Sequence, residues 1–126
     1  MMNQDRRQYE RWYRHIQAVL FDQDSDAEAK CFVKDISEFG ISFVMIEAAE
    51  CPFHKDETIT FQFFDEFPAG PTEESFIITE TAVIRHLEKE QGRWQIGCYL
   101  DSARFREYVV KCEAAADYII LARNVT

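Results

Sequence analysis

One short segment combines three residue types that could bind a polar ligand. Asp35, Ser37 and Gly40 form the pattern D-x-S-x-x-G. The carboxylate accepts hydrogen bonds, the hydroxyl donates and accepts them, and the glycine leaves room for a ligand to approach the backbone. This composition produces the pattern by chance about 0.01 times, so the segment is an informative candidate site. Its alternative is an ordinary hairpin turn, in which the two side chains bond their own backbone and Gly40 takes positive φ.

Arginines are concentrated at the start of the chain. Arg7 and Arg11 are four residues apart, and Arg6 directly precedes them. A guanidinium can bind a phosphate or the O6/N7 edge of guanine through two hydrogen bonds, and it can stack on a purine. The R-x-x-x-R spacing alone is uninformative, because nine arginines in 126 residues generate it about 0.6 times by chance. A solvated basic tail is the alternative interpretation.

Other reactive side chains do not form a catalytic or metal site in the sequence. Cys51 and His54 could offer two zinc ligands, but no second pair follows at a usable spacing. Cys98 and His86 could form a thiol–imidazole pair across neighbouring strands, although a packing cysteine and a surface histidine are the simpler interpretation. The four cysteines lack any C-x-x-C spacing, which favours reduced thiols. We therefore expect neither an enzyme, nor a metal site, nor a cofactor.

The composition restricts the partners of the chain. Its 126 residues suit one domain, and an apolar content of 47% suffices for one compact core. With 23 acidic and 14 basic residues the net charge is -9, which disfavours a nucleic-acid polymer as partner. Residues 1–15 differ, since they hold four arginines against two acidic residues. No apolar run suits a membrane span or a signal peptide, so we expect a cytoplasmic protein without membrane insertion.

Apolar, β-branched and aromatic runs predict six short strands that position these residues. The connecting segments are polar or contain proline and glycine, which suits antiparallel neighbours, and none is predicted to be helical. Ile59, Phe61 and Phe63 alternate onto one face of their strand. The D-x-S-x-x-G pattern lies between the second and third strands. The predicted strands are 12–21, 29–36, 39–46, 58–64, 76–87 and 93–100.

A helix is predicted after the last strand. Asp101 or Ser102 can cap its N-terminus, and the following residues to 123 contain neither glycine nor proline. Apolar residues recur at intervals of four and three, which places them on one face that would pack on the barrel. The predicted fold is mainly β, a six-stranded antiparallel Greek-key-like barrel with a C-terminal helix, because closure removes unpaired strand edges. The helix face consists of Phe105, Val109, Cys112, Ala116 and Ile119.

Both motifs, in this order of elements, resemble the PilZ family of bacterial cyclic di-GMP receptors. The R-x-x-x-R pattern stands just before the first predicted strand, and the resemblance covers nearly the whole chain. Residues 82–85 (AVIR) and 94–100 (WQIGCYL) are similar to the late hairpin of the family. Leu100 stands where an aromatic residue is more usual, which affects packing and leaves the ligand motifs intact. Some members lack the arginine motif and do not bind the nucleotide, whereas this sequence keeps both motifs.

The resemblance implies a receptor that binds cyclic di-GMP and signals through an unidentified protein effector. Arg7 and Arg11 would hold phosphate and the Hoogsteen edge of guanine. Asp35 would accept hydrogen bonds from guanine N1–H or N2–H₂. Ser37 would bond phosphate or guanine, and Gly40 would admit the ligand against the strand.

The resemblance also bears on stoichiometry and organisation. The resemblance implies that members of the family with an arginine at the position of Arg6 bind two mutually intercalated cyclic di-GMP molecules. We therefore expect two ligands per chain. We divide the chain into a flexible arginine-rich arm at 1–11 that becomes ordered with ligand, a PilZ-like barrel at 12–100, and a packed helix at 101–126. The alternative function is a PilZ-like protein-interaction adaptor that binds no nucleotide, and an enzyme acting on a nucleotide ranks third.

Overall fold

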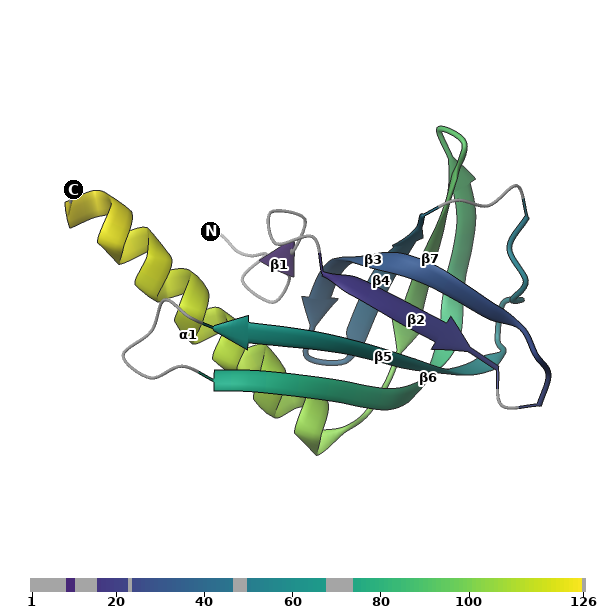
Figure 1. The fold of residues 1–126 in the computed structure, drawn as a ribbon, viewed down its shortest axis with the longest axis horizontal. Coiled ribbons are helices and arrows are strands. Elements are labelled where there is room, and N and C mark those ends of the chain that lie inside the picture. Colours follow the sequence, from purple (N-terminus) through teal and green to yellow (C-terminus); the bar gives the residue numbers. More distant parts are fainter. Residues whose placement is uncertain (1–8, 11–15, 23, 47–49, 68–73, 126) are drawn as a thin grey trace.

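The computed structural model describes residues 9–10, 16–22, 24–46, 50–67 and 74–125, with side chains described within 16–65 and 75–114 (Figure 1). Within these described residues, seven strands precede one helix. They are β1 (Tyr9–Glu10), β2 (Gln17–Phe21), β3 (Glu28–Ser37), β4 (Gly40–Met45), β5 (Thr58–Phe67), β6 (Glu74–Glu90), β7 (Arg93–Tyr99) and α1 (Ala103–Val125).

Six of the strands close into an antiparallel barrel. Hydrogen-bonded neighbours run in the order β3, β2, β5, β6, β7 and β4, and β4 returns to β3 (Figure 1). Each barrel strand therefore has a partner on both sides, which removes the open edges that short strands would otherwise expose. The predicted fold class, a six-stranded antiparallel barrel with a C-terminal helix, is confirmed.

Strand boundaries differ from the sequence prediction mainly at the ends. The first barrel strand begins at Gln17, whereas the prediction extended it to residue 12, and residues 11–15 lie outside the described part of the chain. β6 is longer than predicted and continues through a register shift between Ile84 and His86. The two-residue strand β1 was not predicted, because its stability comes from pairing with β3 and not from its own sequence pattern.

Alternation along the strands builds the barrel interior. Ile59, Phe61 and Phe63 are buried on one face of β5, as predicted. The rings of Phe43 and Phe61 meet inside at a centroid distance of 5.4 Å and an angle of 59°. Aromatic and β-branched side chains from facing strands thus fill the small barrel.

The helix α1 packs its N-terminal half against β5 and β6. Ser102 caps it, because its Oγ accepts a hydrogen bond from the backbone N–H of Phe105 at 3.2 Å. Phe105, Val109 and Cys112 are buried as predicted, while the side chains of Ala116 and Ile119 lie outside the described ones. Within the described residues, no helix combines the length and apolar character needed to traverse a bilayer.

Candidate nucleotide-binding site

The D-x-S-x-x-G segment forms the hairpin between β3 and β4. Ser37 pairs with Gly40 across the turn, and Asp35 pairs with Ser42 one step further along. The Ser42 hydroxyl donates a hydrogen bond to Asp35 Oδ1. Asp35, Ser37 and Ser42 are all half-buried, while Ile36 between the first two is fully buried. The polar side chains of the motif therefore share the outer face of the barrel.

A β-bulge decides which way Asp35 points. The register of β3 against β4 shifts between Val33 and Asp35, so Lys34 is the extra residue. Before the bulge Ala29, Cys31 and Val33 face the interior, and after it Ile36 does. Strict alternation would place Asp35 in the core, whereas the bulge turns its carboxylate to the accessible face.

Gly40 is needed for a different reason than a turn conformation. Its φ is not positive, so that part of the simple-turn interpretation is wrong. A Cβ at this position would lie 3.1 Å from Ser37 Oγ and 3.3 Å from the carbonyl oxygen of Cys98. The absence of a side chain therefore permits the close approach of β4 to both neighbouring strands, and no side chain of residue 40 projects from the outer face of the barrel.

The strand β1 attaches the N-terminal segment beside this hairpin. Its Tyr9 and Glu10 pair with Ile36 and Asp35 of β3. In the sequence, β1 lies between Arg7 and Arg11, so the arginine pattern flanks a strand that is hydrogen-bonded at Asp35.

The structure therefore brings together one half of the predicted site residues. Asp35, Ser37 and Gly40 lie within one hairpin. Arg6, Arg7 and Arg11 lie outside the described residues.

Two residues on the same face were missed by sequence reasoning. Ser42 pairs with Gly97 of β7, so both share the row of Asp35 on the outer face. Ser42 follows Gly40 by two residues, and the period of a strand was a usable signal for it. No sequence pattern places Gly97 beside the motif hairpin, because its contact with Ser42 depends on the pairing of β4 with β7.

The other candidate chemistry of the sequence is not assembled. Cys98 is buried in the barrel, whereas His86 points outward and contacts Glu88 Oε1 at 2.8 Å, so they form no thiol–imidazole pair. Burial raises the pKa of the Cys31 and Cys98 thiols to about 12, which leaves them protonated and unreactive at neutral pH. Among the described side chains, no cluster of three or more His, Cys, Asp or Glu residues could hold a metal ion.

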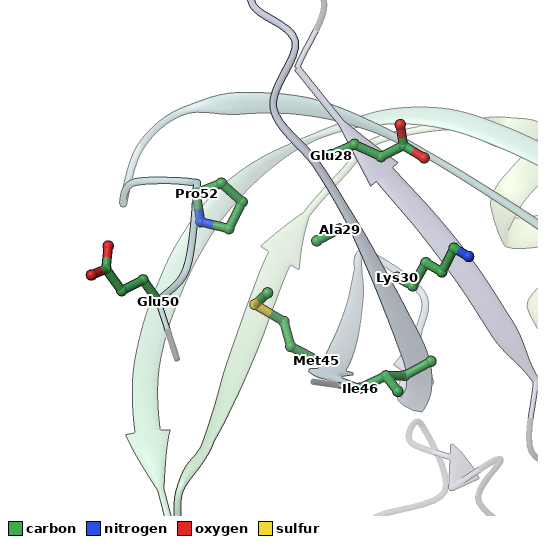
Figure 2. A pocket seen from close by; sticks show the side chains of 7 residues that line it. All are labelled: Glu28, Ala29, Lys30, Met45, Ile46, Glu50 and Pro52. Carbon is green, nitrogen blue, oxygen red and sulfur yellow. The ribbon is translucent and has the colours of Figure 1, made fainter. Parts of the chain in front are cut away.

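A cavity of 410 Å³ lies at the other end of β3 (Figure 2). Met45 and Pro52 supply apolar walls, while Glu28 and Glu50 lie at its margin. Glu28 precedes Asp35 by seven residues along β3, a separation of about 20 Å in an extended strand. Lys30 also lines this cavity, so its charged groups are of both signs, and the cavity is separate from the hairpin site.

Comparisons with known proteins agree with the fold and with the family resemblance. Residues 5–110 match the sequence model of the PilZ domain, and no curated protein matches the chain. The solved structure of the Bacillus subtilis inhibitor of motility, MotI/DgrA, is similar with a TM-score of 0.64 at 12% identity. That alignment covers 93% of this chain and 52% of the other, so the chain spans about half of the length of the protein that it matches. The match over residues 5–110 includes both motifs, and the chain belongs to the PilZ domain family.

Proposed function

We propose that this chain is a receptor for cyclic di-GMP that signals through a protein partner. The pairing of β1 with β3 is the observation that carries the proposal, because it attaches the segment between Arg7 and Arg11 at Asp35. The R-x-x-x-R and D-x-S-x-x-G motifs are distant in sequence, and in this proposal residues of both motifs bind the same ligand. Membership of a family of cyclic di-GMP receptors supports the same assignment.

The roles of the site residues follow from their chemistry. Asp35 Oδ1 accepts from Ser42, which holds the carboxylate in place, and Oδ2 has no partner within the described part of the chain. Asp35 would therefore offer Oδ2 to guanine N1–H or N2–H₂. Ser37 would bond phosphate or guanine at the rim, and Gly40 would let the ligand approach the strand.

The arginines would supply the cationic half of the site. Two phosphates must be neutralised on a protein of net charge -9, and the arginines of residues 1–15 form its basic segment. In this proposal Arg7 and Arg11 clamp phosphate and the Hoogsteen edge of guanine, and Arg6 allows a second, intercalated dinucleotide.

Ligand binding would change the surface that a protein partner recognises, and the protein would catalyse no chemical reaction. Family members act as receptors or adaptors, and the named role of the similar solved protein, inhibition of motility, fits an effect exerted on a partner. Bound nucleotide, the arginine-rich segment and the barrel face would together form the surface that the partner recognises, in the cytoplasm.

A constitutive protein-interaction adaptor is the second candidate. Phe64 of β5 and Ile77 of β6 face each other across the strands, and 54% and 68% of their surfaces are exposed. Exposed apolar side chains that lie together are typical of protein contacts. This surface lies on strands away from the motif hairpin, so it would be available with or without nucleotide.

A thermal-shift comparison with cyclic di-GMP, GMP and ATP separates the two candidates. A ligand at 100 times its dissociation constant stabilises a protein by about 2.7 kcal/mol, which gives a readily measured rise in Tm. We expect a shift with cyclic di-GMP alone, and a smaller shift for Asp35→Ala. The matched control Asp56→Asn removes an exposed carboxylate paired with Arg85 and suits the positive φ of 70° at this position, so it should respond like the wild type. Absence of any shift would favour the adaptor.

A further inference from the structure

The outer face of the barrel continues from the motif hairpin onto β7. Gly40 pairs with Tyr99, and Ser42 pairs with Gly97, so two parallel rows of residues cross β4 and β7. Both glycines stand on this face without a side chain. The surface between Asp35 on β3 and Tyr99 on β7 therefore has two positions without a side chain, bordered by Ser37 Oγ beside Gly40 and by the His86 side chain beside Gly97. Polar groups lie on one side of it and an aromatic ring lies on the other.

The exposed, stacked rings of Phe39 and Tyr99 border this surface on the side opposite Asp35. The rings of Phe39 and Tyr99 lie nearly parallel, 14° apart, with centroids separated by 6.4 Å. Phe39 belongs to the hairpin turn itself, and its backbone oxygen accepts a hydrogen bond from Leu100 N–H at 3.1 Å. Exposed fractions of 44% and 43% leave much of both rings in contact with water.

Arg106 of α1 supports this stack from the helix. Its guanidinium carbon lies 5.1 Å from the ring centroid of Phe39, and its Nη1 lies 2.5 Å from Asp101 Oδ1. The two contacts restrain the arginine over the ring. Because Asp101 largely neutralises this cation, the platform offers ring faces and not free positive charge. Such a surface suits a planar base better than a phosphate.

We propose that Tyr99, backed by Phe39, is a base-stacking residue of the nucleotide site. The proposal rests on the proposed receptor function. β3 and β7 are separated by β4 alone, so Tyr99 and Asp35 stand on strands about 10 Å apart. A cyclic dinucleotide carries two guanine bases. The distance between Asp35 and Tyr99 places the binding position of one base on β3 and that of the other base on β7. Asp35 takes the polar edge of one guanine, and Tyr99 takes the face of the other.

Titration calorimetry with cyclic di-GMP tests the role of the ring. Loss of one base–aromatic stack weakens binding by roughly tenfold or more. We expect that loss in Tyr99→Leu and near wild-type affinity in Tyr99→Phe, which keeps the ring. The matched control is Phe64→Leu, which removes an exposed aromatic side chain from β5 and should bind normally. Thermal melting of each variant checks that the barrel is intact.

A direct contact measurement on the wild-type protein makes the test independent of any variant. Intermolecular nuclear Overhauser effects between guanine H8 and the ring protons of Tyr99 are expected. Wild-type affinity in Tyr99→Leu together with no such effect would overturn the stacking role while the receptor function stands, and would leave the platform for contact with a protein. Absence of binding by the wild-type protein would instead overturn the receptor function, and the stacking role with it.

Discussion

Tyr108 of α1 donates a hydrogen bond from its phenolic hydroxyl to Asp65 Oδ2 of β5, at 2.8 Å. Both residues are buried, with exposed fractions of 1% and 4%. The Tyr108 ring also meets Phe63 and Phe76 edge to face, at 5.5 and 5.7 Å. One side chain thus joins the helix to the hairpin of β5 and β6 through both a polar and an apolar contact.

Tyr108→Phe should lower the free energy of unfolding. The substitution keeps the ring contacts but removes a buried donor from Asp65, a loss of about 1–3 kcal/mol. Urea unfolding monitored by circular dichroism measures the change. Tyr99→Phe is the matched control, because Tyr99 is 43% exposed, and it should unfold at the wild-type midpoint. Equal midpoints for both variants would show that the hydroxyl of Tyr108 does not stabilise the fold.

Arg11→Ala and Asp35→Ala should each weaken cyclic di-GMP binding by at least tenfold. Each removes a charged hydrogen-bonding group, and such contacts contribute about 1.5–3 kcal/mol. Calorimetric titration measures the affinity, and neither substitution should change Tm without ligand by more than a few degrees. Arg85→Ala, at an exposed ion pair with Asp56, serves as control. Wild-type affinity in both site variants would refute the assignment of the motifs.

The wild-type chain should bind two cyclic di-GMP molecules, and Arg6→Leu should bind one. Two stacked ligands bring four phosphates together, and their repulsion requires an additional cation beside them. The molar ratio at saturation in a calorimetric titration gives the answer directly. The Arg6 variant should retain the affinity of its single site. A ratio of one for the wild type would contradict the role given to Arg6 without affecting the receptor assignment.

Cys51 should react with a thiol reagent before Cys31 and Cys98. Burial raises the pKa of all three thiols, but Cys51 is only half-buried, whereas the other two have pKa values of about 12. A raised pKa means that the reactive thiolate appears only as the pH increases, so the rate at Cys51 should rise from pH 7 to pH 9. Absorbance from an aromatic disulfide reagent follows the reaction. Cys51→Ser should abolish the early phase, and persistence of that phase would contradict this order.

Several local features were predictable because neighbours in the sequence decide them. The period-2 burial of Ile59, Phe61 and Phe63 follows from the alternation of side chains along a strand. The cap at Ser102 depends only on the first turn of the helix. The turn between Asp35 and Gly40 likewise needs only a short polar segment between two apolar runs.

Tertiary structure decided which of these residues can meet a ligand. Asp35 faces outward only because β3 contains a bulge at Lys34, and the alternation before it gives no sign of the reversal. Tyr99 reaches the motif hairpin only because β4 pairs with β7, although residues 46–92 of the chain separate the two strands. A sequence pattern records the preference of each segment for its own conformation and for burial. The pairing of distant strands depends instead on how all six barrel strands close together, and that closure sets the geometry of the candidate site.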